Sequence, residues 1–144
     1  MSASCRVLRT VAFAAPAYLA RRGRPRHPDE LARHECVVRL TDRDEEAWSF
    51  AIDGRRRDVR VRGRFRADSA AATNEAVALG LGIGFSPLWQ VRRMVDRGDV
   101  EIVLEGFEAP RVPVHAVWPS TRAPLVNARL FADALTERLK RERL

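Results

Sequence analysis

Lysine, cysteine and long apolar runs are all scarce in this chain of 144 residues. No stretch reaches the roughly 18 consecutive apolar residues that a membrane-spanning helix needs, so we expect no transmembrane segment. Two cysteines, Cys5 and Cys36, are too few for a disulfide-rich scaffold. We expect both thiols to be reduced, with Cys36 buried beside Val37 and Val38.

An apolar segment near the start of the chain, residues 11–20, superficially resembles a secretory signal. Pro16 and Tyr18 interrupt this segment, and arginines crowd residues 21–24 directly after it. These features are atypical of a cleaved leader. The sequence therefore predicts a cytoplasmic protein that does not associate with membranes.

Positive charge exceeds negative charge, with 26 basic residues against 19 acidic ones and a net charge of +7. Such an excess favours an anionic partner, although an arginine-rich composition also arises from GC-rich coding. At strand spacing, four arginines would line one face of a predicted strand over residues 58–66 as a ladder: Arg60, Arg62, Arg64 and Arg66. This face is either a phosphate-binding stripe or a solvated strand edge. We favour the solvated edge, because the only interleaved aromatic, Phe65, falls on the opposite face.

Strand and helix patterns alternate along the chain. Proline and glycine bound a helix over residues 17–22, and Asp68 or Ser69 caps a helix that ends before Gly80. The order predicts an α/β sandwich with a mixed sheet. The further predicted strands are residues 6–13, 36–40, 48–52, 82–86, 100–104 and 112–118, and the further helices are residues 28–34, 87–97 and 124–141.

Patterns that would indicate an enzyme or a metal site are incomplete. The glycines from Gly80 to Gly84 follow a helix and precede a strand, which is the reverse of a dinucleotide-binding loop. Ser86 lacks the glycine two residues later that a nucleophile elbow requires. His34 and Cys36 supply only two of the three or four ligands of a zinc site. We therefore expect no catalysis, no metal and no cofactor.

Two predicted helix starts are candidates for binding a small anion. One lies at Asp68 and Ser69, and the other follows the break at Ala15 and Pro16. Unpaired N–H groups at such helix starts attract carboxylates, and capping by the local side chain is the alternative explanation. We expect both starts to face the same end of the sheet, where α/β proteins commonly bind ligands.

The order of several loose motifs together resembles the effector-binding domain of LysR-type transcriptional regulators. The resemblance covers most of the chain, and each motif is weak without the others. The motifs are Ala14-Ala15-Pro16 with Tyr18-Leu19, Pro28-Asp29-Glu30-Leu31 with His34-Glu35-Cys36, Trp48-Ser49-Phe50, Gly63-Arg64-Phe65, Gly80-Leu81-Gly82-Ile83-Gly84, and Val114-His115-Ala116-Val117-Trp118-Pro119.

This resemblance implies a periplasmic-binding-protein-like (type 2) fold, a three-layer sandwich with a mixed sheet. It places a crossover strand at residues 1–13, the second effector subdomain at residues 14–111, and the return strand and C-terminal helix of the first subdomain at residues 112–144. On this reading the chain lacks a winged helix-turn-helix and most of the first subdomain. We therefore expect an exposed apolar patch near Val126, Phe131 and Leu135 that causes association or instability.

The resemblance also implies a function and a site. The chain would bind a small, acidic effector for transcription control, form a homo-oligomer, and reach promoter DNA only through a winged helix-turn-helix. The alternatives are a stand-alone solute-binding protein of the same fold and a non-functional truncated remnant. Carried over by resemblance, one wall of the effector cleft consists of Ala15, Pro16, Asp68, Ser69, Phe85 and Ser86.

Overall fold

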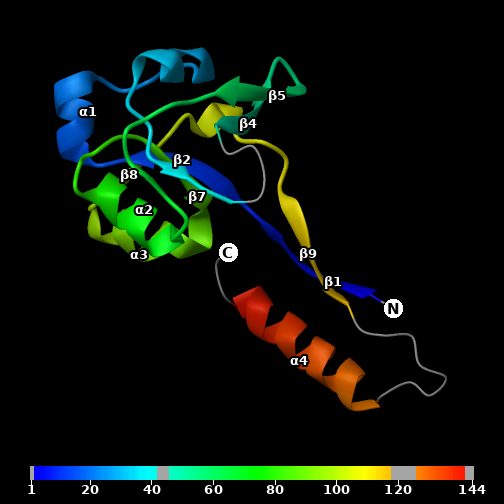
Figure 1. The fold of residues 1–144 in the computed structure, drawn as a ribbon. Helices are drawn as coiled ribbons and strands as arrows, with labels where there is room; N and C mark the ends of the chain where they lie inside the picture. The colour runs from blue at the N-terminus through cyan, green and yellow to red at the C-terminus, as the bar shows by residue number, and fades with distance from the viewer. Residues whose placement is uncertain (1, 42–45, 118–125, 142–144) are drawn as a thin grey trace. The chain divides into compact units, whose positions relative to one another are not determined.

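The computed structural model describes residues 2–41, 46–117 and 126–141. The chain divides into two compact units (Figure 1). The larger unit is Thr10–Pro110, and the smaller combines Met1–Arg9 with Arg111–Leu144. Trp118 and Pro124, where a strand was predicted to end and a helix to begin, lie outside the described residues.

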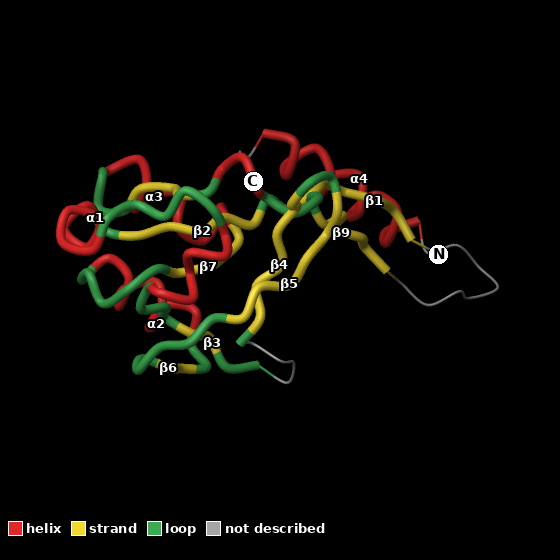
Figure 2. The backbone as a smooth tube through the Cα atoms, turned by 90° about the horizontal axis from the view of Figure 1, so that it is seen from above, coloured by secondary structure: helices red, strands yellow, loops and turns green. Residues whose placement is uncertain are grey.

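Apart from a hairpin described below, the short strands of the larger unit form two groups. In one, β3 (Val38–Arg39) pairs in parallel with β6 (Arg66–Ala67), and Figure 2 shows these strands side by side. In the other, β2 (Thr10–Ala14) lies between β7 (Gly84–Pro87) and β8 (Glu101–Val103) and runs antiparallel to both. The prediction of a single strand over residues 6–13 is therefore wrong, because one strand ends at Leu8 and β2 begins after Arg9.

Two backbone hydrogen bonds join these two groups of strands into one sheet. The Val37 N–H donates to the Ile83 carbonyl at 2.8 Å, and the Ile83 N–H donates to the Glu35 carbonyl at 2.9 Å. The resulting order is β6-β3-β7-β2-β8, in which only β2 runs against the others. The predicted mixed sheet is confirmed.

Helices cover one face of this sheet. Val11 and Phe13 of β2 point to this face and pack with α2 (Ala70–Ala78) and α3 (Leu88–Arg97). The Ser69 hydroxyl caps α2 by accepting the Ala72 N–H at 3.3 Å. The predicted helix stop after α2 is also confirmed, since Gly80 adopts a φ of +85°.

A hairpin and two short helices cover the other face. Ala12 and Ala14 of β2 pack there with α1 (Pro16–Arg22) and with the 3-10 helix η1 (Pro28–Arg33). The hairpin brings in further apolar side chains, so the unit has three layers. Together the described elements make a three-layer sandwich.

The hairpin pairs β4 (Ala47–Ile52) with β5 (Arg55–Arg60). Trp48, Phe50 and Ile52 alternate toward the core, as the period-two pattern predicts. Asp53 and Gly54 both have positive φ, which matches the twist of a tight hairpin turn.

The predicted arginine ladder is wrong, because β5 ends at Arg60. The chain then crosses to the segment before β3, where the Cys36 N–H donates to the Arg62 carbonyl at 3.1 Å. Arg66 begins β6 in a different ladder. Arginines 60–66 therefore do not share one strand face.

Two glycines allow this crossing. A Cβ on Gly63 would lie 1.6 Å from the Cys36 carbonyl oxygen, and one on Gly82 would lie 2.5 Å from the Glu35 carbonyl oxygen. Real side chains do not approach backbone so closely, so both positions require glycine. Cys36 is fully buried at this junction, as predicted, and burial raises the pKa of its thiol to about 12.

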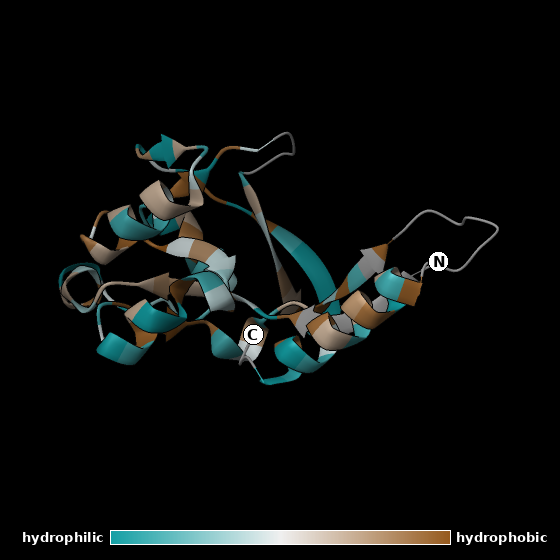
Figure 3. Cartoon of the chain, turned by 90° about the horizontal axis from the view of Figure 1, so that it is seen from below, coloured by the Kyte–Doolittle hydropathy of each residue, from teal (hydrophilic) through white to brown (hydrophobic). Residues whose placement is uncertain are grey.

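In the smaller unit, the structure describes two strands and one helix. β1 (Ser2–Leu8) pairs antiparallel with β9 (Val112–Val117), and α4 (Val126–Arg141) packs against β1. Both hydrophobic and hydrophilic residues appear along α4 in Figure 3. Ala132 is buried, whereas Phe131 is 70% exposed.

Gly63→Ala should destabilise the chain by about 3 kcal/mol or more, because the new methyl group collides with backbone that cannot move aside. Gly106→Ala is the matched control, since nothing lies within 4 Å of its Cβ position. Urea unfolding followed by circular dichroism measures both. Equal midpoints for the two variants would contradict the close approach.

Phe131→Ser should reduce self-association of the chain, because its ring is exposed on α4 together with the apolar side chains of Val126 and Leu130. Arg129→Ser, at an exposed polar position of the same helix, is the control and should associate like the unaltered chain. Size-exclusion chromatography with light scattering at several concentrations measures the mass. A monomer of the unaltered chain at all concentrations would refute the prediction.

Candidate functional site

The carboxyl ends of β3, β6, β7 and β8 lie at one edge of the sheet, called here the carboxyl edge. After β3 the chain connects to β6 on one side, whereas β7 lies on the other side of β3. Such a switch in strand order opens a crevice that open α/β sheets use for ligands. The antiparallel β2 places its first residue, Thr10, at the same edge opposite Pro87.

A cavity of about 390 Å³ occupies this edge. We call it the carboxyl-edge cavity. It combines the start of β2, the end of β3, the end of β7 and the outer part of the hairpin. Its lining residues are Thr10, Arg39, Thr41, Ala47, Trp48, Ser49, Arg56, Asp58, Phe85, Ser86 and Pro87.

Aromatic side chains form the apolar part of the cavity wall. The rings of Trp48 and Phe85 are stacked, with centroids 5.2 Å apart and planes 12° apart. Phe50 supports Phe85 from the hairpin at 5.5 Å. Because Trp48 and Phe50 are buried, this stack is fixed before any ligand arrives.

The hairpin contributes a polar cluster to the same cavity. The Ser49 hydroxyl donates to Asp58 Oδ1 and accepts from Arg56 Nη2 at 3.0 Å. Arg56 Nε also lies 3.9 Å from the Asp58 carboxylate. These contacts across the β4–β5 pair hold the Arg56 guanidinium in place and balance its charge.

Unlike Arg56, Arg39 forms no ion pair with the residues that the structure describes. Its Nε atom is buried and forms no hydrogen bond with any residue that the structure describes. A buried donor without a partner costs about 1–3 kcal/mol, and a donor on a charged group costs more. An anionic oxygen placed in the cavity would satisfy it.

Behind the cavity, Ser86 is fastened to α2. Its hydroxyl donates to Asn74 Oδ1 at 2.8 Å, and both residues are 5% exposed. This bond ties the end of β7 to the helix that covers the sheet. It also occupies the hydroxyl proton of Ser86, which contacts no base.

The structure brings some of the predicted site residues together. Phe85 and Ser86 line the carboxyl-edge cavity. Asp68 and Ser69 follow β6 at the same edge but are not among the lining residues of that cavity, and the Ser69 hydroxyl is used as the cap of α2.

Ala15 and Pro16 lie at the opposite edge. The expectation that they face the same end as Asp68 and Ser69 is wrong, because β2 runs antiparallel to β7 and Ala14 precedes them at its far end. Nothing in the local sequence indicates the direction of β2. Strand pairing alone decides it.

The sequence analysis missed most of the cavity lining, including Arg39, Trp48 and Arg56. A signal existed for Arg39, which is the one charged residue within the apolar stretch of residues 36–40. A lone charge in a buried strand usually has a partner or a function. Trp48 was placed at the start of a predicted strand, but its position beside Phe85 depends on the hairpin.

Within the part of the chain that the structure describes, no group of three or more His, Cys, Asp or Glu side chains could hold a metal ion. None of the described helices is long and apolar enough to cross a membrane. The predicted absence of a metal and a cofactor stays a prediction.

A mixed sheet in the order β6-β3-β7-β2-β8, covered on both faces and with a cavity at its carboxyl edge, defines the ligand-binding lobe of a type 2 periplasmic-binding-protein-like fold. The regulatory domain of CrgA, a LysR-type transcriptional regulator from Neisseria meningitidis, superposes with a TM-score of 0.81 at 25% identity. The match covers 96% of this chain and 68% of that domain. The predicted fold class is confirmed.

Residues 6–140 match the LysR substrate binding domain family, and the chain belongs to this family. The Escherichia coli K12 protein YcaN, an uncharacterized HTH-type transcriptional regulator, is 35% identical over 121 residues, or 83% of this chain and 39% of that protein. The HTH-type transcriptional regulator PtxR of Pseudomonas aeruginosa is 33% identical over 132 residues, or 92% of this chain and 42% of that protein. The chain thus spans about two fifths of the length of these relatives.

Ser86→Ala should destabilise the fold by about 1–3 kcal/mol, because Asn74 Oδ1 loses its donor in a buried position. A double-mutant cycle with Asn74→Ala isolates the contact, and we expect the two effects to be non-additive by about 0.5 kcal/mol or more. Chemical unfolding of the four proteins measures the cycle. Strict additivity would mean that the two side chains do not interact.

Proposed function

We propose that this chain is the effector-binding part of a LysR-type transcriptional regulator, and that its effector is a small acid bound in the carboxyl-edge cavity. Family membership supports the regulatory role, since the relatives described above are HTH-type transcriptional regulators. The regulator would act in the cytoplasm. Its effector would be sensed without being chemically altered.

Arg39 carries the proposal that the effector is an acid. Its Nε atom lies buried at the cavity without a partner among the described residues, so a carboxylate or phosphate oxygen would complete its hydrogen bonding. Arg56 adds a second guanidinium on the hairpin side of the cavity. The stacked rings of Trp48 and Phe85 would contact the apolar body of the ligand.

A binding role fits the cavity better than catalysis. Acyl transfer needs a nucleophile in contact with a general base. The Ser86 hydroxyl donates instead to the amide oxygen of Asn74, and the Ser49 hydroxyl lies between Arg56 and Asp58. Although the Ser49 hydroxyl donates to the Asp58 carboxylate, its oxygen also accepts from Arg56 Nη2 at 3.0 Å, which occupies a lone pair that a nucleophile would use.

Transcription control would require further parts. The relatives have HTH-type names and are more than twice as long as their matched region, so we propose that promoter DNA is contacted through a helix-turn-helix and that the working form is a homo-oligomer. We further propose that residues 14–111 form the second effector subdomain. Residues 112–144 would then return to the first subdomain. Asp68 and Ser69 remain proposed effector contacts by family resemblance alone, whereas Ala15 and Pro16 lie at the opposite edge of the sheet, away from the carboxyl-edge cavity.

Arg39→Gln should weaken binding of the effector by about 10- to 150-fold, which corresponds to the 1.5–3 kcal/mol of a hydrogen bond to a charged group. Thermal shift with a panel of small mono- and dicarboxylates and their neutral amides identifies the ligand. We expect acids to stabilise the unaltered chain and the amides to have no effect.

Arg97→Gln is the matched control, because it removes the same charge from an exposed ion pair with Asp99 outside the cavity. Its acid binding should equal that of the unaltered chain. Equal binding by Arg39→Gln and Arg97→Gln would refute the role of Arg39. Stabilisation by amides as strong as by acids would refute the acidic effector.

A further inference from the structure

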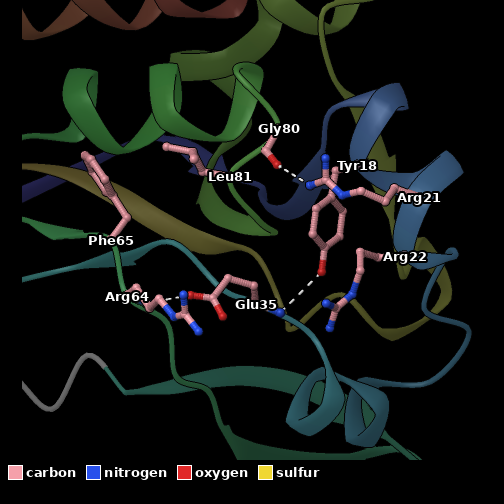
Figure 4. A pocket seen from close by; sticks show the side chains of 8 residues that line it. All are labelled: Tyr18, Arg21, Arg22, Glu35, Arg64, Phe65, Gly80 and Leu81. Carbon is pink, nitrogen blue, oxygen red and sulfur yellow. Dashed lines mark hydrogen bonds between the residues drawn. The ribbon is translucent and has the colours of Figure 1, made fainter.

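A second cavity lies at the opposite edge of the sheet, where β3, β6 and β7 begin. It has a volume of about 480 Å³ and lies between α1, the segments before β3 and β6, and the end of α2. Figure 4 shows the side chains of Arg21, Arg22, Glu35 and Arg64 around it. It shares no lining residue with the carboxyl-edge cavity.

An adjoining cavity of about 370 Å³ extends this space. It shares Arg22, Glu35 and Arg64 with the first and adds Arg33 and Arg62. We call the two together the arginine groove. The segments that carry these residues meet because Gly63 and Gly82 lie directly against the backbone of residues 35 and 36.

The arginines of this groove are not neutralised by acids. Among the described residues, none of the five forms an ion pair: Arg21, Arg22, Arg33, Arg62 and Arg64. Elsewhere on the larger unit, several arginines are paired, for example Arg57 with Asp29 and Arg66 with Glu46. Glu35 is the only carboxylate lining the groove, and its Oε1 accepts the Arg64 backbone N–H at 2.6 Å. The groove therefore has an uncompensated positive charge.

Hydrogen bonds to backbone carbonyls hold two of the guanidinium groups. Arg21 Nη2 donates to the Gly80 carbonyl at 3.1 Å, and its guanidinium carbon lies 5.9 Å from the centre of the Tyr18 ring. Arg22 Nη2 donates to the Arg33 carbonyl at 3.3 Å. A guanidinium that is already oriented loses less side-chain entropy when an anion binds.

Tyr18 and His34 form the floor between these arginines. The Tyr18 hydroxyl and His34 Nδ1 form a hydrogen bond at 2.8 Å, and the same hydroxyl accepts the Glu35 N–H at 3.3 Å. Burial, and after it the positive charge of Arg22, lowers the pKa of His34, and burial raises the pKa of the Tyr18 phenol. Both groups therefore stay neutral near pH 7, and the arginines alone determine the positive charge.

The other end of the groove is apolar. Phe65 and Leu81 line the first cavity and are 37% and 47% exposed. Figure 4 places these two side chains on the side of the cavity away from Arg21 and Arg22. A ligand in this cavity would meet Arg21 and Arg22 at one end and Phe65 and Leu81 at the other, where Figure 4 also places Arg64.

We propose that the arginine groove is a second ligand site, which binds a small organic anion with its phosphate or carboxylate group at Arg22 and Arg64 and its apolar group on Phe65 and Leu81. Concave shape distinguishes it from a general basic surface, and Arg22, which a backbone carbonyl holds in place, supplies planar donors suited to these anions. The site is independent of the carboxyl-edge cavity.

Isothermal titration of the chain with phenyl phosphate, phenylacetate and inorganic phosphate tests this proposal. The two aromatic probes share a ring and distinguish a phosphate site from a carboxylate site. We expect at least one of them to bind about tenfold or more tightly than inorganic phosphate. Leu81→Ser should remove most of that advantage.

Arg22→Gln/Arg64→Gln should weaken the preferred aromatic probe by at least about tenfold. Arg93→Gln, at an exposed arginine of α3 that lines neither cavity, is the control and should bind like the unaltered chain. Circular dichroism confirms that each variant is folded, and the two single variants are measured if the double variant unfolds. Equal loss in the control would overturn the proposal in favour of diffuse electrostatic attraction.

Two further outcomes would also overturn it. A loss in Arg39→Gln as large as that in Arg22→Gln/Arg64→Gln would place the probe in the carboxyl-edge cavity. Random duplex DNA that binds more tightly than the probes, and is lost in Arg22→Gln/Arg64→Gln, would make the groove a nucleic-acid surface. Retention of probe binding in Arg39→Gln supports a separate site, whatever the outcome for the effector.

Discussion

The close approach of three backbone segments around Glu35 and Cys36 is the constraint on which the larger unit depends. The segment before β3 bonds to Ile83 on one side and to the Arg62 carbonyl on the other. Gly63 and Gly82 leave room for this, because a Cβ on either would overlap a carbonyl oxygen. Without the junction, the β3–β6 ladder would not join β7, and the sheet would have no continuous edges on which to build sites.

Residues on either side of this junction line two different cavities. Glu35, just before β3, lies in the arginine groove, and Arg39, at the end of β3, lies in the carboxyl-edge cavity. One edge has a cavity lined by both a stacked aromatic pair and an arginine with a buried Nε atom. The other has several exposed guanidinium groups around a neutral floor of Tyr18 and His34.

Features that depend on residues adjacent in the sequence were predictable from the sequence. Proline and glycine marked the ends of α1, Asp68 or Ser69 was predicted to cap α2, and the order of motifs indicated the family. The direction of β2 was not predictable. Alternation of apolar and polar residues shows which side chains share a face of a strand, but it does not show which strands pair with it or in which direction. Residues 61–65 alternate like a strand but serve as a crossing, since Gly63 packs on backbone instead of pairing in a ladder. Arg39 lines a cavity together with residues of the hairpin, and the sequence around Arg39 does not show that the hairpin lies there.

The near absence of lysine has a consequence for how the arginine groove would respond to its surroundings. A guanidinium keeps its charge throughout the pH range in which proteins are folded. The floor beneath these groups is neutral near pH 7, because the pKa of His34 is lowered and that of Tyr18 is raised. Between neutral and mildly alkaline pH, any titration of anion binding in the groove would therefore report the ionisation of the bound molecule itself. Amine-directed acylation would leave the positive charge of the groove intact.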